Sequence, residues 1–498
     1  MREESKKEVN IDVNENYIQH LKYFLEDQEI KNLLESLKKP LKKSIKINLN
    51  KISPLELQRD TESLGRKFYD ANYEEKNSNI KDLFYIDRED TSLALGKTFY
   101  HLSWFFYVQE ISAWVPAKLI EIKENDLILD ISAAPGWKSS QLADYLKSQW
   151  EHKWLVVAND VNKKRTQSLA HNLNRTGMYN TAVTSKNWFM FGKNLPEVFD
   201  HVLVDAPCSW EGTAFKSVAA LKYWKHQETK RLAGTQFQLL MSAVKSVKEW
   251  WTIVFSTCTI NPYENEYNIK KILDYMQDYI ELEDINIPEK SPWISKVWEE
   301  EILPETQANK LARFWPHIQK SWGFFIAKLR KKQSTKEKFN PKDNKLAPKN
   351  PFQADFSKKL QKNVINYIKE NFDIDLNNSW YFFFATKNQV YITTEKILDI
   401  KDILEFEKIW VPVLKFSMNN YRPLHALWVI LWDFAKKNYV ELEYETVQEY
   451  ANRNDIDLNN IKYQNIERKD YIIIKYKWYW IWVGKVIENY IKNKYIKI

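Results

Sequence analysis

The chain has 498 residues, and its 74 Lys and Arg against 66 Asp and Glu give a formal net charge of +8. That length predicts two to four domains, and the mild positive charge suits a partner that carries phosphates. Two cysteines exclude a disulfide framework and a thiolate metal cluster, so no metal is expected. The charged start and the lack of any run of ~20 apolar residues favour a cytoplasmic protein without a signal peptide or a membrane partner.

Changes in composition divide the chain into five parts. Residues 1–16 are polar and are expected to form a flexible tail, and 17–82 predict a small N-terminal α+β domain. From 83 to 330 strand-like and helix-like segments alternate, which predicts an α/β domain with a doubly wound parallel sheet. Residues 331–351 are lysine-rich and typical of a linker. Residues 352–498, rich in β-branched and aromatic residues, predict a C-terminal α+β, β-rich domain.

The first clear strand of the α/β region, Asp126–Ile131, runs into a tight glycine-containing turn and a helix from Lys138. Such a turn lets backbone amides and a helix N-terminus approach a polar ligand. The next strand ends at Asp160, roughly 20 residues further on, where an acid is placed to bind ribose hydroxyls. The competing interpretation of Asp160 is a helix N-cap. The spacing of a phosphate-binding loop is absent.

Each of the two cysteines lies in a short phrase that follows an apolar, β-rich run. Cys208 belongs to Asp205–Ser209, and Cys258 belongs to Ser256–Thr259. Both thiols are therefore expected at the carboxyl ends of strands, where open α/β sheets have their active sites. The competing interpretation is a pair of buried structural thiols, since free cysteine is among the most buried residue types.

Glycine and tryptophan occur in unusual proportions. The chain has 9 Gly and 21 Trp, and the two together approach the roughly 7% that glycine alone usually reaches. Several tryptophans stand where a tight turn requires glycine, such as Trp137 after Gly136 and Trp250 and Trp251 before a strand. We hypothesise that most of them are UGA codons that the source organism reads as glycine, which the heavy use of Lys, Asn and Ile fits. The alternative is that all 21 are real.

Three motifs together carry a resemblance to a known family. Asp130–Lys138, Asp205–Thr213 and Ser256–Glu266 resemble the Nol/Nop/Sun family of RNA cytosine-5 methyltransferases. Shorter matches at Tyr107–Glu110, Asn174–Gly177 and Arg313–His317 support them. The resemblance covers about residues 20–330 and implies a Rossmann-like, S-adenosylmethionine-dependent methyltransferase core at 83–330. Seven family glycine positions hold tryptophan here: Trp104, Trp137, Trp188, Trp210, Trp250, Trp251 and Trp322.

The resemblance also implies a role for each motif residue. Cys258 is expected to add to C6 of the cytosine and Cys208 to assist release, with Asp205 at the edge of the base and Lys138 orienting it. Asp160 would bind the ribose of S-adenosylmethionine, and Asn187 stands where the family usually has Asp beside the adenine. The remaining cofactor contacts are expected from Ser132, Ala133, Ala134, Pro135, Gly136, Trp137, Lys138 and Asp205.

The implied partner is RNA, with small-subunit (16S) ribosomal RNA or its precursor as the first expectation and transfer RNA as the second. The C-terminal unit resembles, more loosely, the added PUA-like RNA-binding domain of the longer bacterial members, through Ile409–Pro412, Arg422–His425 and Gly484–Asn493. The N-terminal domain is likewise expected to bind RNA. DNA is not expected, and neither is an oligomer. A small-molecule methyltransferase is disfavoured, and real tryptophans at 137 and 210 would instead favour a catalytically inactive RNA-binding assembly factor.

Overall fold

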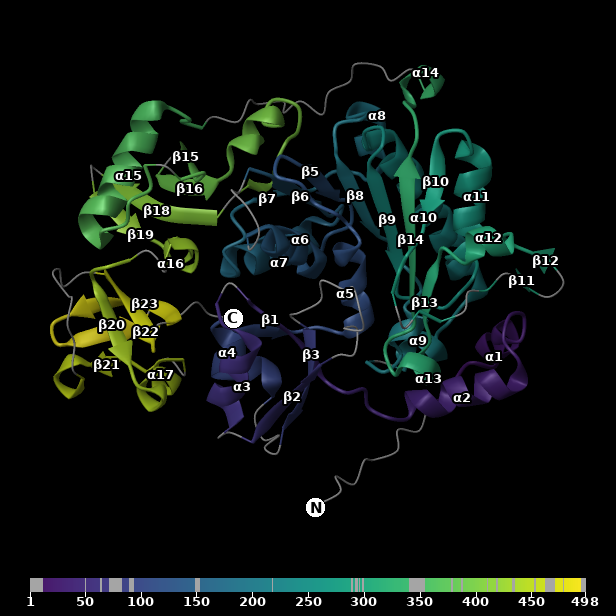
Figure 1. Cartoon of the computed structure of the whole chain (residues 1–498), viewed down its shortest axis with the longest axis horizontal. Helices are drawn as coiled ribbons and strands as arrows, with labels where there is room; N and C mark the ends of the chain where they lie inside the picture. Colours follow the sequence, from purple (N-terminus) through teal and green to yellow (C-terminus); the bar gives the residue numbers. More distant parts are fainter. Residues whose placement is uncertain are drawn as a thin grey trace.

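The protein is described here by a computed structural model. It describes residues 12–339 and 354–493 apart from gaps at 50, 63–64, 71–82, 89–93, 148–152, 217, 288–289, 292–293, 295, 298–299, 378, 387, 410, 418–419, 432–434, 452–453, 462–470 and 478. The expected tail at 1–16 thus lies mostly outside the described residues, and so does the expected linker from 340 onward. Figure 1 shows the N-terminal sheet below a central sheet, with two C-terminal sheets beside them.

The central sheet has the strand order β10-β14-β9-β8-β5-β6-β7-β17, with β13 paired to β14. Strands β5 to β9 pair in parallel, which confirms the predicted doubly wound sheet, and β10, β14 and β17 join by antiparallel pairing. The chain order reverses at β5, which lies between β6 and β8 and forms a topological switch point. The strands are β5 Leu127–Asp130, β6 Leu155–Asn159, β7 Thr181–Thr184, β8 His201–Asp205, β9 Thr252–Thr257, β10 Ile280–Glu283, β13 Ala312–Phe314, β14 Phe324–Lys331 and β17 Lys408–Ile409.

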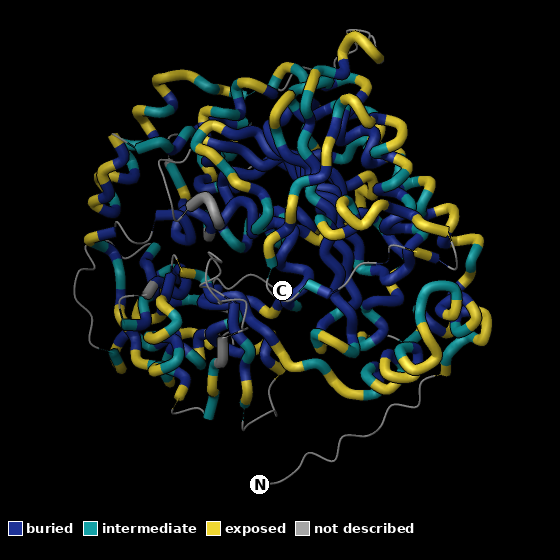
Figure 2. Tube along the Cα trace, turned by 45° about the vertical axis from the view of Figure 1, so that its right-hand side comes forward, coloured by how far each residue is buried: buried dark blue, intermediate teal, exposed yellow. Residues whose placement is uncertain are grey.

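Helices cover both faces of this sheet, which explains why its inner strands are continuous apolar runs. One hydrophobic cluster joins one strand face to α5, α6 and α7, and a second joins the opposite face to α8, α10 and α11. Figure 2 shows the resulting buried interior along the strands and exposed turns on the outer helices. The helices are α5 Ile111–Lys118, α6 Trp137–Lys147, α7 Lys163–Arg175, α8 Phe189–Asn194, α10 His226–Ser246 and α11 Glu266–Met276.

The N-terminal region forms two separate parts. Helices α1 and α2 pack through Tyr17, Leu21 and Leu33 onto the cluster that also holds α10. A four-stranded antiparallel sheet of order β2-β3-β1-β4 follows. Strands β3 and β4 lie beyond the expected boundary at residue 82 but hydrogen-bond to β1, so they belong to this sheet. The elements are α1 Glu15–Leu21, α2 Asp27–Leu37, β1 Ser44–Ile47, α3 Pro54–Glu62, β2 Arg66–Asp70, β3 Leu83–Arg88, α4 Phe99–Leu102 and β4 Phe106–Val108.

The C-terminal region contains two further sheets, of order β15-β16-β18-β19 and β20-β22-β23-β24-β21. It is joined to the core because β17 pairs with β7 and because Ile397, Ile400 and Leu404 enter the core cluster. The elements are α15 Lys358–Phe372, β15 Phe382–Thr386, β16 Gln389–Thr393, η3 Glu395–Asp399, β18 Val411–Ser417, β19 Asn420–Pro423, α16 His425–Leu431, β20 Tyr439–Leu442, α17 Tyr444–Ala451, β21 Ile456–Asp457, η5 Leu458–Asn460, β22 Tyr471–Tyr476, β23 Tyr479–Ile487 and β24 Tyr490–Asn493.

Shorter elements connect these parts: η1 Leu95–Lys97, η2 Glu211–Thr213, α9 Ala219–Lys222, β11 Lys296–Val297, β12 Glu300–Glu301, α12 Glu305–Ala308, α13 Pro316–Gln319 and α14 Lys336–Phe339. Within the part of the chain that the structure describes, every helix is too short or too polar to cross a membrane.

Three tryptophans have a backbone conformation that favours glycine. Trp104, Trp210 and Trp250 have φ of 63°, 64° and 68°, in the left-handed region. No other non-glycine residue type contributes as many of the described positive-φ positions. An L-residue rarely adopts this conformation, because its Cβ approaches the following carbonyl oxygen. Trp210 and Trp250 are also 60% and 66% exposed, so their indoles bury little that would offset the strain.

Replacing Trp210 or Trp250 by glycine is therefore expected to stabilise the protein. The left-handed conformation costs an L-residue about 1–2 kcal/mol, and the greater freedom of glycine in the unfolded chain takes back about 0.4–1 kcal/mol. We expect each substitution to raise the free energy of unfolding by up to about 1.6 kcal/mol, seen as a higher melting temperature.

Tyr223 provides a matched control, since it is 70% exposed but has φ of −102°. Tyr223→Gly should give no stabilisation. An equal gain in all three variants would mean that loss of an exposed aromatic ring, and not relief of the backbone, is the cause.

Candidate active site

The two cysteines meet because their strands are neighbours. Strands β8 and β9 pair in parallel with Asp205 opposite Ser256, so the segments that follow both strands leave the same edge of the sheet. The Sγ atoms of Cys208 and Cys258 lie 2.8 Å apart. The expectation that both thiols stand at strand ends is confirmed, and their mutual contact argues against two unrelated structural thiols.

The two thiols differ in their surroundings. Cys208 is buried, whereas Cys258 is partly accessible. Burial, the contact with Cys258 and two nearby carboxylates raise the pKa of the Cys208 thiol well above its usual value. Lys216 interacts electrostatically with Cys258; its own pKa is lowered, chiefly by partial burial. The more accessible thiol thus has a cation among its electrostatic neighbours.

Lys138 and Asp205 form an ion pair next to the thiols. The Nζ atom of Lys138, near the start of α6, lies 2.7 Å from Oδ2 of Asp205 at the end of β8. The Ser256 hydroxyl donates to the other oxygen, Oδ1, at 2.8 Å. With both oxygens engaged, the Asp205 carboxylate is fixed in orientation while its side chain stays one-third exposed. The structure thus brings together all four residues predicted to be catalytic.

The turn after β5 is built for close approach to a ligand. The Ala133 amide donates to the carbonyl of Asn159 at 2.7 Å, which ties the turn to the end of β6. Gly136 has φ of +106°, and a Cβ there would lie 2.8 Å from Cδ1 of Leu169. Ser132 and Ala134 are buried, while Pro135 is exposed and Trp137 begins α6 and stacks on Tyr107. Only glycine fits at position 136 without displacement.

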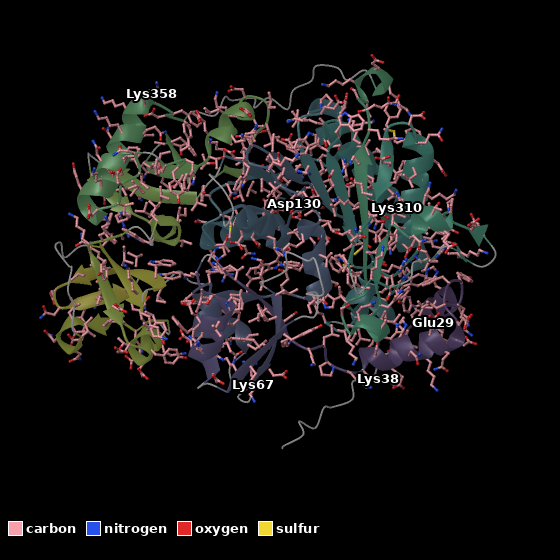
Figure 3. The ribbon with its side chains drawn as sticks, in the orientation of Figure 1. Glu29, Lys38, Lys67, Asp130, Lys310 and Lys358 are labelled. Carbon is pink, nitrogen blue, oxygen red and sulfur yellow. The ribbon has the colours of Figure 1, made fainter. Side chains whose placement is uncertain are left out.

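Asp130 is the residue at this turn that the sequence did not single out. It ends β5, is fully buried, and lies near the middle of the molecule in Figure 3, far from labelled outer residues such as Lys67 and Lys358. Ser139 donates to its Oδ2 at 2.6 Å, but its buried Oδ1 has no hydrogen-bond partner among the described residues. Burial raises the pKa of Asp130 to about 7. An acceptor left open at a glycine turn suits a ligand that donates protons, so the residues fit a cofactor with an ammonium group.

Asp160 and Asn187 have different local roles. Asp160 is fully buried at the end of β6 and pairs with Nη1 of Arg165 at 3.1 Å. The helix N-cap of α7 is Asn162, whose Oδ1 accepts from the Lys164 amide, so the N-cap interpretation of Asp160 is wrong. Asn187 is exposed, and its Oδ1 accepts from the Phe189 amide at 3.1 Å at the start of α8.

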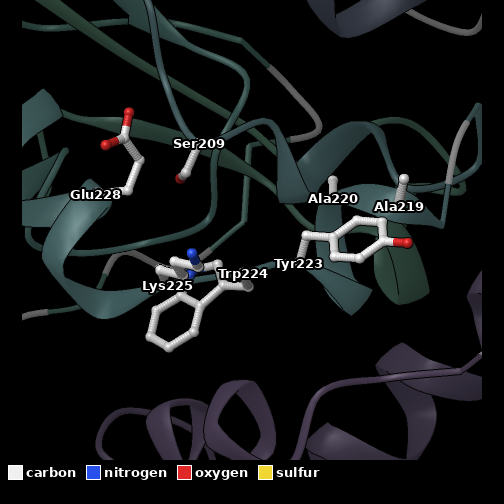
Figure 4. A pocket seen from close by; sticks show the side chains of 7 residues that line it. All are labelled: Ser209, Ala219, Ala220, Tyr223, Trp224, Lys225 and Glu228. Atoms are coloured by element: carbon white, nitrogen blue, oxygen red, sulfur yellow. The ribbon is translucent and has the colours of Figure 1, made fainter.

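A cavity of ≈ 450 Å³ opens beside the Cys208 segment. Figure 4 shows Ser209 and Glu228 on one side, the Tyr223 ring on the other and Lys225 with Trp224 between them; Ala219 and Ala220 complete the lining. The cavity thus combines an exposed aromatic ring and a lysine, and Ser209, the residue after Cys208, forms part of its lining. Across the described residues, no group of three or more His, Cys, Asp or Glu side chains is arranged to hold a metal ion.

The fold and site define a methyltransferase of the Rossmann-like class. Residues 117–330 match the family described as 16S rRNA methyltransferase RsmB/F. Together with its motifs, this match makes the chain similar to the Nol/Nop/Sun family, and S-adenosylmethionine is its cofactor.

Comparisons with individual proteins agree with this family. The chain is 29% identical over 466 residues to ribosomal RNA small subunit methyltransferase F of Vibrio campbellii, covering 93% of this chain and 92% of that one. The protein of the same name from Aeromonas salmonicida is 28% identical, with 92% and 90% covered. A methyltransferase homologue from Pyrococcus horikoshii matches in structure with a TM-score of 0.55 and 26% identity, covering 65% of this chain and 96% of that one.

The Gly136→Ala variant tests the cofactor turn. The added Cβ meets the Leu169 side chain at 2.8 Å, and φ of +106° strains any L-residue at this position, so we expect the turn to distort and S-adenosylhomocysteine to bind at least about tenfold more weakly. Isothermal titration calorimetry measures this. Gly234→Ala is the matched control, because a Cβ at that position in α10 meets nothing within 4 Å. Equal affinity of both variants would disprove the proposed binding role of the turn.

Proposed function

We propose that this methyltransferase transfers a methyl group to C5 of a cytosine in RNA through a covalent intermediate. The observation that carries the proposal is the pair of thiols 2.8 Å apart, beside the Lys138–Asp205 ion pair. A methyltransferase that acts on an oxygen or an amine does not need two thiols. Cytosine C5, in contrast, is a poor nucleophile until a group adds to C6.

The residues divide the chemistry as follows. The Cys258 thiolate adds to C6 and pushes an electron pair onto C5. Asp205, held by Lys138 and Ser256, binds the base near N3 and the amino group and favours this addition. Bound S-adenosylmethionine supplies the electrophilic methyl group at the turn from Ser132 to Lys138. In release, the Cys208 thiol gives its proton to the departing Cys258 sulfur and takes the C5 proton, while C5=C6 re-forms and the C6–S bond breaks.

For the substrate we propose small-subunit (16S) ribosomal RNA or its precursor. The relatives with this function in their names span nearly the same length, and the net charge of +8 favours a phosphate-bearing partner. The cavity with Tyr223 and Lys225 suits an unstacked base and its phosphate close to the target, which must leave its stack to reach the thiols. We assign further RNA contact to the N-terminal and C-terminal domains, in a monomeric, cytoplasmic enzyme.

The test is methyl transfer from labelled S-adenosylmethionine to small-subunit rRNA, assembled small subunits, transfer RNA and DNA. Wild-type enzyme should label a cytosine of the rRNA. Cys258→Ser should lose at least about 10⁴-fold in rate, because the nucleophile is gone. Cys208→Ser should accumulate a protein–RNA adduct that survives denaturation, visible as a shifted band on a denaturing gel.

Cys208→Ser/Cys258→Ser is the control and should form no adduct. If Cys258→Ser stays active and Cys208→Ser traps nothing, the two roles are assigned wrongly. Labelling of transfer RNA alone would replace the ribosomal substrate by the second candidate.

We further propose that the gene is read with UGA as glycine. Trp104, Trp210 and Trp250, three of the seven tryptophans at family glycine positions, have positive φ. The Trp104 and Trp188 indole N–H groups are buried without a hydrogen-bond partner among the described residues. A buried indole N–H normally finds an acceptor. Backbone conformation at Trp104, Trp210 and Trp250 therefore supports the composition argument, and the unsatisfied donors at Trp104 and Trp188 are consistent with it.

Mass spectrometry of the protein isolated from its native source tests this directly. Peptides that cover positions 137 and 210 are expected to carry glycine, which would be about 129 Da lighter at each position. Glycine would also open the cofactor turn and the Cys208 loop, so activity should be measured on a recoded gene. Tryptophan at both positions would refute the recoding and favour an RNA-binding protein without catalysis.

A further inference from the structure

Two buried carboxyl groups meet at one hydroxyl group directly after Cys208. The Oγ atom of Ser209 is within hydrogen-bond distance of Oε2 of Glu211 and of Oε1 of Glu264. Glu211 is 2% exposed and Glu264 is fully buried. Glu211 starts η2, and Glu264 lies in the loop between Cys258 and α11. The pair therefore connects the segments that carry the two thiols.

The hydrogen bonds around Ser209 require one proton more than the hydroxyl and amide donors supply. Oε1 of Glu211 accepts from the Thr259 hydroxyl at 2.5 Å, and Oε2 of Glu264 accepts from the Ser209 amide at 3.1 Å and from Nε2 of Gln236 at 2.7 Å. The Ser209 hydroxyl has a single proton and donates to one carboxylate only. The second close oxygen pair at Ser209 needs another proton, which a protonated carboxyl group supplies.

The donors decide which carboxyl group holds that proton. Two hydroxyl groups, Thr259 and Ser209, face Glu211, one at each oxygen, so Glu211 is satisfied as an acceptor only. Glu264 receives both of its other donors at Oε2, which leaves Oε1 free to carry a proton toward Ser209. One chain of hydrogen bonds satisfies every group: Glu264 donates to Ser209, and Ser209 donates to Glu211.

The surrounding charges agree with this assignment. The groups that interact with the pair are Cys208 and, through it, Cys258, Tyr17 of α1 and Arg313 of β13. Tyr17 and Cys208 both have a pKa raised well above their usual values and are neutral. The Arg313 guanidinium is already bound at two nitrogens by Glu266. Burial raises the pKa of both carboxyl groups. Arg313 opposes this rise at Glu211, whereas the Glu211 charge adds to it at Glu264 and brings that pKa to about 8.

We propose that Glu264 is protonated at neutral pH and, as a hydrogen-bond donor to Ser209, is a positioning residue that holds Cys208 against Cys258. Glu264 is linked to both neighbours of Cys208 in the chain, Ser209 and Pro207. The Ser209 amide binds Glu264, and Nε2 of Gln236, which also binds Glu264, donates to the Pro207 carbonyl at 2.8 Å. Ionised Glu264 would face the Glu211 carboxylate across a hydroxyl that satisfies only one of them, and the Cys208 segment would shift.

The test compares two isosteric variants in methyl transfer, and this part rests on the proposed function. Glu264→Gln mimics the protonated form, because its amide donates to Ser209 and its oxygen accepts from Gln236. It should keep kcat within about twofold at neutral pH and lose the alkaline fall in activity that we expect of wild type as Glu264 ionises near pH 8. Glu211→Gln presents an amide where a hydroxyl must donate, so kcat should drop at least about tenfold with KM nearly unchanged.

A second measurement does not need catalysis. A protonated carboxyl group has a C=O stretch distinct from that of a carboxylate, so the infrared difference between about pH 6 and pH 10 reports the ionisation. Among the bands that wild type loses, one should have a midpoint near pH 8, and that band should be missing in Glu264→Gln. Subtracting the two spectra removes Asp130 and Glu110, whose pKa values burial also raises.

Three results would overturn the proposal: a Glu264→Gln variant as impaired as Glu211→Gln, an alkaline fall in activity that persists in Glu264→Gln, or identical infrared differences in wild type and Glu264→Gln. If wild type methylates no RNA, the proposed function fails by itself, and the infrared band still decides whether Glu264 holds the proton.

Discussion

The active site depends on the parallel pairing of β8 with β9. Their register sets Asp205 opposite Ser256, so the two catalytic segments begin at the same height above the sheet. A strand rises about 3.3 Å per residue, and a slip of one residue would also turn every side chain to the other face. The Sγ–Sγ distance of 2.8 Å and the bond from Ser256 to Asp205 would both be lost. Burial of both strands on both faces prevents such a slip.

Beyond the ends of β8 and β9, buried polar contacts and close backbone packing hold the active-site loops in place. Arg313 and Glu266 are fully buried, and Nη1 of Arg313 also donates to the Ile260 carbonyl two residues after Cys258. Breaking such a pair by removing one partner costs about 3–5 kcal/mol. Gly212 lies so close to the Cys258 carbonyl that a Cβ would sit 2.6 Å from its oxygen. The Arg313–Glu266 ion pair thus holds the Cys258 loop on one side. On another side the loop packs closely against Gly212, which has no side chain.

The sequence was sufficient for whatever depends on local pattern. Apolar runs with turn residues located β5, β6, β8 and β9, and the motifs at their ends located both thiols and Lys138. Local sequence pattern does not predict which distant segments pair with one another. Strands β3 and β4 join β1 across some 40 to 60 residues of sequence, and β17 joins β7 across more than 200. Lys216 and Glu264 were missed for the same reason, since their proximity to the thiols arises only when separate loops pack together.

The tryptophans link the low glycine content of the chain to the backbone geometry of the loop that follows Cys208. Trp210 lies two residues after Cys208, and its positive φ turns the chain into η2, which brings Gly212 against the Cys258 carbonyl. This path lies between the end of β8 and the buried contacts of Glu211 with Ser209 and Thr259. A turn that the fold imposes in the left-handed region suits glycine best. The count of glycines over the whole chain and the backbone angle at this one loop are independent observations, and the proposed reading of UGA as glycine would account for both.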